Sequence, residues 1–167
     1  MADLSSFRVL FVCLGNICRS PMAEGTFRAM VRAQDLQDVI TTDSAGTGSW
    51  HVGSAPDRRA VREMAARGYD IGDLRGRQVT RADFERFDLV LAMDYDNLED
   101  LERLAGPQRA EKIRLFLDFA GEEAPDEVPD PYYGGPDGFA YALDLVEAAS
   151  KGLLSHIKNR LAERAGF

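Results

Sequence analysis

Residues 9–21 read VLFVCLGNICRSP, and this stretch decides how the chain is expected to fold. Starting two residues earlier, FRVLFV (7–12) is a run of β-branched and apolar side chains that is typical of a buried strand. Gly15 then predicts a loop, and Ser20 and Pro21 predict a helix start with Ser20 as the N-cap. A strand that passes through a short loop into a helix is a typical first unit of an α/β fold with a parallel sheet.

Strand and helix signals alternate along the rest of the chain. A helix is expected over 21–34, in which Glu24 favours the positive end of the helix dipole. Further strands are expected at 38–44, 87–93 and 112–117, further helices at 56–67, 81–86, 94–105 and 139–164, and a long acidic loop at 118–138. This order predicts one three-layer α/β domain over 1–167, a parallel sheet of four strands with helices on both faces.

The amino-acid composition limits which partners the protein is expected to bind and in which compartment it is expected to act. The chain has 167 residues, 45% of them hydrophobic and 29% charged, as in ordinary globular proteins. Its net charge of −8 disfavours nucleic acid and anionic membranes as partners. No run approaches the roughly 18 apolar residues of a membrane span, and no basic leader precedes the first strand, so a cytoplasmic protein is expected. Cys13 and Cys18 cannot form the disulfide framework of a small secreted domain, so reduced thiols are expected. Together with His51 and His156 they lack metal-ligand spacing, which argues against a zinc site, and no cofactor is expected.

Cys13 stands at the predicted carboxyl end of the first strand, the edge at which parallel sheets bind ligands. Backbone N–H groups in a loop that opens a helix favour an anion, and Gly15 lets the backbone approach it. Arg19 adds a planar guanidinium that can bind two oxygens of a phosphate. The same positive field favours the thiolate of Cys13, which is a nucleophile. A small buried cysteine is the alternative, but strand, glycine loop, arginine and helix start together predict phosphoryl transfer to sulfur.

A departing phenolate or alkoxide needs a proton donor at neutral pH. The best candidate is Asp130 in the sequence VPDPYY (128–133), where two prolines stiffen the loop. Tyr132 and Tyr133 follow at once, and they can form the walls of a slot for an aromatic ring. The alternative interpretation is an ordinary Asp-Pro turn within a solvated acidic loop.

Three motifs resemble the low-molecular-weight protein tyrosine phosphatases: CLGNICRSPMAE (13–24), SAGT (44–47) and DPYY (130–133). The likeness covers nearly the whole chain, including Trp50, DRR (57–59) and FDLVLAMDYDNL (87–98). The resemblance implies hydrolysis of phosphotyrosine in proteins through a phosphocysteine intermediate, with a parallel sheet of four strands and no metal. Its partner would be a tyrosine-phosphorylated protein, for which a bacterial tyrosine kinase is one candidate, and the enzyme would be a monomer or a weak dimer.

The resemblance also implies a role for each matching residue. Cys13 would attack phosphorus, Arg19 would bind the substrate and the transition state, and Asp130 would act first as acid and then as base. Ser44 would bond to Asn16 and support the loop, and the Ser20 hydroxyl would stabilise the thiolate. The substrate-binding residues would be Leu14, Gly15, Asn16, Ile17, Cys18, Ser20, Trp50, Tyr132 and Tyr133. Cys18 would also form a reversible disulfide with Cys13.

One segment departs from the family. Many members carry H-x-[AS]-R where this chain has Leu74-Arg75-Gly76-Arg77, so the contacts of that histidine must be replaced or absent. Arg58, Arg59 and Arg77 are expected to be structural or surface ion-pair residues.

Three other functions remain open. Related phosphoarginine phosphatases typically have threonine at the position of Ile17, whose apolar side chain suits an aryl phosphate. Arsenate reductases of the same fold need further cysteines downstream, and none follows Cys18. A module that only binds phosphotyrosine is expected to lack the nucleophile or the acid, whereas this sequence has a candidate for both.

Overall fold

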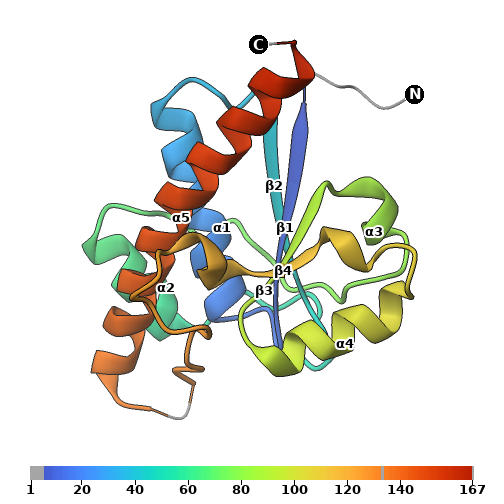
Figure 1. Cartoon of the computed structure of the whole chain (residues 1–167). Coiled ribbons are helices and arrows are strands. Elements are labelled where there is room, and N and C mark those ends of the chain that lie inside the picture. Colours follow the sequence, from blue (N-terminus) through green and yellow to red (C-terminus); the bar gives the residue numbers. More distant parts are fainter. Residues whose placement is uncertain (1–5, 133, 167) are drawn as a thin grey trace.

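The computed structural model describes residues 6–132 and 134–166 (Figure 1). The stretch that begins at Phe7 forms strand β1, which lies inside the sheet. In the described part of the chain the sheet has four parallel strands in the order β2-β1-β3-β4. These strands are β1 (Phe7–Cys13), β2 (Ile40–Gly46), β3 (Leu89–Ala92) and β4 (Ile113–Leu115). The α-helices are α1 (Arg19–Ala33), α2 (Arg58–Ala66), α3 (Asp83–Arg86), α4 (Tyr95–Ala105) and α5 (Pro136–Arg164), and 3₁₀ turns lie at η1 (Ala110–Lys112) and η2 (Phe116–Phe119).

Helices cover both faces of this sheet. Phe7, Val9 and Phe11 of β1 are buried with residues of α1, α2 and α5, whereas Leu10 and Val12 are buried with residues of α3 and α4. Figure 1 shows the same division, with α1, α2 and α5 on one side of the strands and α3 and α4 on the other. Successive strand side chains point to opposite faces, so a strand covered on both sides is apolar throughout. The predicted three-layer α/β architecture is therefore confirmed.

The main core centres on Phe11. Its ring meets that of Phe27 from α1 edge to face at 5.8 Å, and that of Phe116 from η2 at 5.2 Å. All three side chains are fully buried. Such aromatic pairs add to the stability gained from area burial alone, and here they fix α1 against β1.

Two predictions at the start of α1 are wrong. The helix begins at Arg19 with Cys18 as its N-cap residue and no side-chain cap, so Ser20 lies inside the first turn. The Ser20 hydroxyl contacts Cys13 and Asn16 instead. Glu24 lies beyond the first turn and is buried, so it does not serve the helix dipole as an exposed first-turn acid would.

Other element ends differ by a few residues. β2 begins and ends two residues later than expected, and α5 begins at Pro136 rather than 139. Proline favours the first turn of a helix, because its missing N–H would have no intrahelical partner there. The acidic segment is accordingly shorter than predicted.

Gly46 brings the loops after β1 and β2 into contact. It pairs with Cys13 at the ends of their strands, and a Cβ added to it would lie 2.8 Å from the Leu14 carbonyl oxygen. The Thr47 N–H donates to the Cys13 carbonyl, and the Gly48 N–H donates to the Leu14 carbonyl, both at 2.9 Å. The backbone after β2 therefore supports the loop that follows Cys13.

Replacing Gly46 by alanine should displace this loop. We expect Gly46→Ala to lower the free energy of unfolding by about 1–3 kcal/mol, the usual cost of overpacking, because the added methyl meets backbone atoms. Urea denaturation followed by circular dichroism measures the change. The control is Gly138→Ala in the first turn of α5, where a Cβ would make only an ordinary contact at 3.6 Å. Equal stability of both variants would contradict the close approach at Gly46.

Candidate active site

A pocket of about 420 Å³ opens at the carboxyl end of β1. Cys13 is the last residue of that strand, and the residues after it curl around the pocket floor before α1 begins at Arg19. The pocket is lined by Cys13, Leu14, Gly15, Ile17, Cys18, Arg19, Trp50, His51, Asp130 and Tyr132. Residues distant in sequence thus meet at the sheet edge that the sequence indicated.

The Cys13 sulfur is surrounded by hydrogen-bond donors. Its side chain is only 2% exposed. The Asn16 N–H donates to Sγ at 3.3 Å, and the Ser20 Oγ lies 3.0 Å from Sγ. Asn16 has a φ of 57°, a left-handed conformation that asparagine tolerates better than most residues and that curls its N–H toward the sulfur. Both donors would stabilise a thiolate.

A buried amide connects Ser20 to the end of β2. Asn16 Nδ2 donates to Ser20 Oγ at 2.8 Å and to Ser44 Oγ at 3.0 Å. Asn16 Oδ1 accepts from the backbone N–H of Arg77 at 2.9 Å. The segment that departs from the family pattern thus reaches the loop through its backbone, and the contact expected between Asn16 and Ser44 is present.

Arginines outside the pocket make ion pairs, as expected for Arg59 and Arg77. Arg77 bonds to Asp43 and Asp83 at 3.0 Å, and Arg59 bonds to Asp57 at 3.0 Å. The Arg59 guanidinium also lies over the Tyr132 ring, 5.3 Å from its centroid. Tyr132 itself lines the pocket, so this cation–π contact supports one of its walls from outside.

Arg19 is held by a carboxylate that the sequence analysis missed. Its side chain is 3% exposed, and its Nη1 donates to Asp94 Oδ2 at 2.6 Å and to the Val128 carbonyl at 3.0 Å. Burial works to lower the pKa of Arg19, but Cys13 and the hydrogen bond to Asp94 raise it above its ordinary value. Asp94 is also the N-cap of α4, accepting from the Asn97 N–H at 2.7 Å. Arg19 therefore stays charged and fixed.

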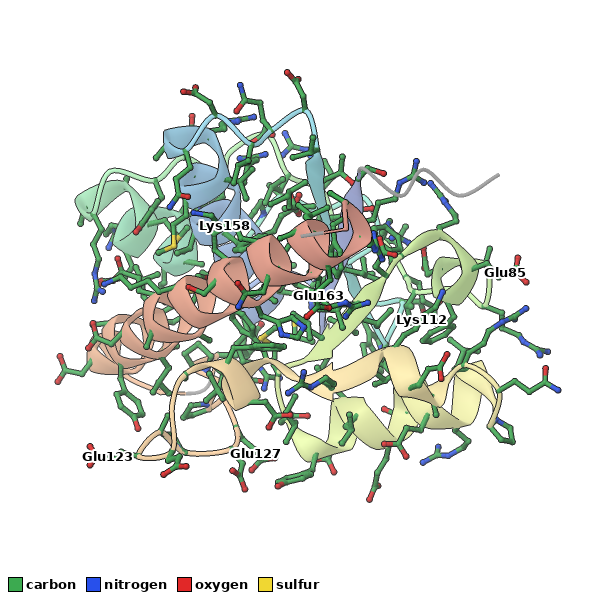
Figure 2. The ribbon with its side chains drawn as sticks, turned by 45° about the horizontal axis from the view of Figure 1, so that its top comes forward. Glu85, Lys112, Glu123, Glu127, Lys158 and Glu163 are labelled. Atoms are coloured by element: carbon green, nitrogen blue, oxygen red, sulfur yellow. The ribbon has the colours of Figure 1, made fainter. Side chains whose placement is uncertain are left out.

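Asp130 reaches the pocket from the loop before α5, which hydrogen bonds hold in place. The buried Val128 donates its N–H to the Met93 carbonyl at 2.8 Å, and Tyr95 at the start of α4 donates to Glu127 and Asp126. Glu123 and Glu127 themselves are exposed on the outer side of this loop (Figure 2).

The Asp130 carboxylate lies at the pocket mouth. Its Oδ2 is 3.6 Å from Arg19 Nη2, and its Oδ1 accepts from the Tyr132 N–H at 3.1 Å. The carboxyl group is thus held beside the guanidinium, at a place where a leaving group can reach it.

Besides the Asp130 carboxylate, the pocket rim carries exposed apolar side chains and one imidazole. Trp50 is 72% exposed and Leu14 is 43% exposed, so both offer surface to a ligand. His51 was not predicted as a site residue, although it follows Trp50 directly. It lies against Gly15, where an added Cβ would be 3.1 Å from His51 Cδ2. The rim therefore combines aromatic and aliphatic surface with the Asp130 carboxylate and one imidazole.

The predicted residues divide into two groups. Cys13, Arg19, Asp130, Leu14, Gly15, Ile17, Cys18, Trp50 and Tyr132 line the pocket. Asn16, Ser20 and Ser44 lie behind it and hold the loop. Tyr133 falls outside the described residues. Asp94 comes two residues after the end of β3, which pairs with β1 through Val12 and Ala92. Its position just after a buried strand was a signal that could have found it.

No group of three or more histidine, cysteine, aspartate or glutamate side chains gathers to hold a metal ion in residues 6–132 and 134–166. Among the helices of the same ranges, none has the length and apolar character needed to cross a membrane.

A cysteine, an arginine and a carboxylate thus line one pocket at the carboxyl edge of the parallel sheet, the set of groups that a cysteine-dependent phosphatase uses. The sequence model of the family described as "Low molecular weight phosphotyrosine protein phosphatase" matches residues 8–163. A low molecular weight protein-tyrosine-phosphatase of Streptomyces coelicolor is 47% identical over 165 residues, covering 96% of this chain and 99% of the relative. The chain therefore belongs to the low molecular weight phosphotyrosine protein phosphatases, a family of cysteine-dependent enzymes.

Solved structures agree in fold. A protein tyrosine phosphatase from Entamoeba histolytica with Hepes in its active site has a TM-score of 0.88 and 40% identity, over 92% of this chain and 98% of that one. The Drosophila arginine phosphatase DARP has a TM-score of 0.83 and 37% identity, over 90% of this chain and 97% of that one.

Removing the Asp94 carboxylate should destabilise the protein. We expect Asp94→Ala to lower the free energy of unfolding by about 3 kcal/mol, because buried Arg19 loses its closest partner and α4 loses its cap. The control is Asp96→Ala, an exposed acid in the first turn of the same helix, for which a change within about 0.5 kcal/mol is expected. Equal losses in denaturant titrations would contradict the role of Asp94.

The second pocket cysteine should resist alkylation. Burial, with the charge of Asp57 second, raises the pKa of the Cys18 thiol above its ordinary value, so this thiol stays protonated at neutral pH and well above it. Because the thiolate is the reactive form, iodoacetamide at pH 7 should label Cys13 alone. Peptide mass spectrometry measures the labelled site, and Cys18→Ala should still take up one label. Labelling of Cys18 in the native protein would contradict this expectation.

Proposed function

We propose that the chain hydrolyses phosphotyrosine in proteins through a phosphocysteine intermediate. One observation carries the proposal: Cys13, Arg19 and Asp130, from the end of a strand, the start of a helix and a distant loop, line a single pocket. A nucleophile, an anion-binding cation and an acid within one pocket are the groups that phosphoryl transfer to sulfur requires.

In the first step, the Cys13 thiolate attacks phosphorus, so that the S–P bond forms as the bond from phosphorus to the phenolic oxygen breaks. Arg19 binds two equatorial oxygens with its planar guanidinium. Asp130 donates its proton to the departing oxygen, and tyrosine leaves as a neutral phenol. The hydrogen bonds from Asn16 and Ser20 support the reactive thiolate beforehand.

In the second step, water attacks the phosphocysteine. Asp130, now a carboxylate, takes the proton of that water, the S–P bond breaks, and inorganic phosphate leaves. The Cys13 thiolate and the protonated Asp130 are restored, so no metal or cofactor enters the cycle.

The pocket rim supports an aryl substrate. Ile17, Trp50 and Tyr132 offer apolar and aromatic surface to a phenyl ring above the sulfur. The Entamoeba relative holds Hepes, a sulfonate, in its active site, which supports anion binding in the corresponding pocket here.

Phosphoarginine hydrolysis is the second candidate, because the relative DARP is an arginine phosphatase at 37% identity. Ile17 argues against it here, since an apolar side chain offers no hydroxyl to orient water on a phosphoarginine intermediate.

We further propose the setting of this activity. Residues 1–167 act as one phosphatase domain, in keeping with the family match over residues 8–163. The partner is a tyrosine-phosphorylated protein, and a bacterial tyrosine kinase fits that class. The reaction needs reduced Cys13, which favours the cytoplasm. When the Cys13 thiolate is oxidised, Cys18 in the same pocket is the proposed disulfide partner that protects it.

A substrate panel separates these functions. We expect the protein to release phosphate from phosphotyrosine peptides, with phosphoserine and phosphoarginine peptides slower by at least about tenfold. Cys13→Ser should abolish release yet still bind vanadate, because the anion site remains. Preference for phosphoarginine would replace the proposal by the second candidate, and full activity of Cys13→Ser would overturn it.

Loss of the acid should depend on the leaving group. We expect Asp130→Ala to slow phosphotyrosine hydrolysis by about 10²–10⁴-fold, the usual contribution of a positioned acid. An activated nitrophenyl ester should be slowed less at its first step, because its leaving group departs without a proton. Steady-state and burst kinetics on both substrates measure the difference. Equal slowing of the burst on both would rule out Asp130 as the acid.

A further inference from the structure

A buried carboxyl group lies at the far end of the hydrogen-bond chain behind Cys13. Glu24 of α1 is 5% exposed, and its Oε1 accepts from the Ser44 hydroxyl at 2.8 Å. Ser44 Oγ accepts in turn from Asn16 Nδ2, which also donates to Ser20 Oγ, and Ser20 Oγ touches the Cys13 sulfur. The Glu24 carboxyl group, which takes no part in the proposed reaction, is therefore connected to the Cys13 sulfur by a series of hydrogen bonds.

The direction of each bond follows from the fixed amide. The Arg77 backbone N–H can only donate, so the atom it meets on Asn16 must be Oδ1. Nδ2 therefore faces the two serines and donates one proton to each. Each hydroxyl oxygen accepts from Asn16 and keeps its own proton for another partner. Ser44 gives that proton to Glu24, and Ser20 turns it toward Cys13, since its other acceptor, the Ala45 carbonyl, lies at 3.5 Å.

We propose that Glu24 is a positioning residue: its carboxylate holds the Ser44 hydroxyl, and through it the Asn16 amide, so that the Ser20 proton points at the Cys13 thiolate. The inference rests on the proposed function, because it assigns Cys13 as the nucleophile. Glu24 does not touch the reacting atoms, and its positioning role is exerted through these three side chains.

Charged groups near Glu24 come from three elements. Asp43 lies beside Ser44 on β2, Arg28 is one turn further along α1, and Asp73 lies in the loop after α2. Arg28 bonds to Asp73 at 2.9 Å and to the Asp70 carbonyl at 2.9 Å. Burial raises the pKa of Glu24 above its ordinary value, and the hydrogen bond from Ser44 opposes that shift. The Ser44 hydroxyl, and after it the charge of Arg28, favour a charged Glu24.

Two effects of removing this charge have opposite signs. A lost negative charge near Cys13 should, through space, make the thiol ionise at a lower pH. Loss of positioning should instead make it ionise at a higher pH, because the Ser20 hydrogen bond to the thiolate weakens. The pH midpoint of Cys13 alkylation therefore separates the two effects.

The experiment compares the pH midpoint of iodoacetamide labelling of Cys13 in wild type, Glu24→Gln, Glu24→Asp and Asp73→Asn. Glu24→Asp keeps the negative charge but moves the carboxylate away from the Ser44 hydroxyl. Asp73→Asn removes a negative charge near Glu24 and leaves every hydrogen bond between Glu24 and Cys13 in place. We expect a higher midpoint and an about fivefold lower kcat/KM for both Glu24 variants, the effect of one hydrogen bond. Asp73→Asn should leave the midpoint unchanged or lower it.

A double-mutant cycle with Ser44→Ala tests whether the effect passes through that hydroxyl. In the Ser44→Ala background, Glu24→Gln should raise the midpoint no further. Additive effects, or an unchanged or lowered midpoint in Glu24→Asp, would overturn the inference. Circular dichroism checks that each variant folds. If Glu24→Gln does not fold, the test rests on Glu24→Asp and Ser44→Ala, both of which should raise the midpoint of Cys13 labelling. A wild-type midpoint like that of a free thiol would instead overturn the proposed function.

Discussion

The hydrogen bonds around the Cys13 sulfur are the constraint on which the site depends. A charge on a buried sulfur is costly unless donors surround it. The Asn16 N–H and the Ser20 hydroxyl supply those donors, and the left-handed backbone of Asn16 curls the loop so that its N–H reaches Sγ. The loop keeps this shape because Asn16 is held from behind by Ser44 and by the Arg77 backbone.

The parallel sheet brings these groups together. The end of β1 carries Cys13, the end of β2 carries Ser44 and Gly46, and Asp94 follows β3. Since the carboxyl ends of parallel strands meet at one edge, groups from distant parts of the chain converge there. The loop that carries Asp130 is tied to the same edge through the backbone of Met93. A buried, apolar scaffold thus holds a small polar cluster in place.

The sequence predicted the units that depend on local pattern. The buried strand β1 and the loop that leads into α1 could be predicted because the short stretch 9–21 carries the signals for both. Asp130 was predicted as a site residue from the stiffness of its two prolines, and it does line the pocket. Asp94 was missed although it comes shortly after a buried strand, because its contact with Arg19 spans 75 residues and its position alone does not name its partner. Ser20 was misread as an N-cap because the same hydroxyl suits a helix start and a neighbouring sulfur, and only the geometry separates these uses.

The most direct test of the account is to trap its covalent intermediate. Asp130→Ala, mixed rapidly with an activated aryl phosphate and quenched in denaturant, should carry one phosphoryl group, and peptide mass spectrometry should assign it to the sulfur of Cys13. We expect the adduct to form within the first turnover and to disappear as phosphate is released. Turnover of the same substrate with no adduct, or with the phosphoryl group on another residue, would contradict the proposed mechanism.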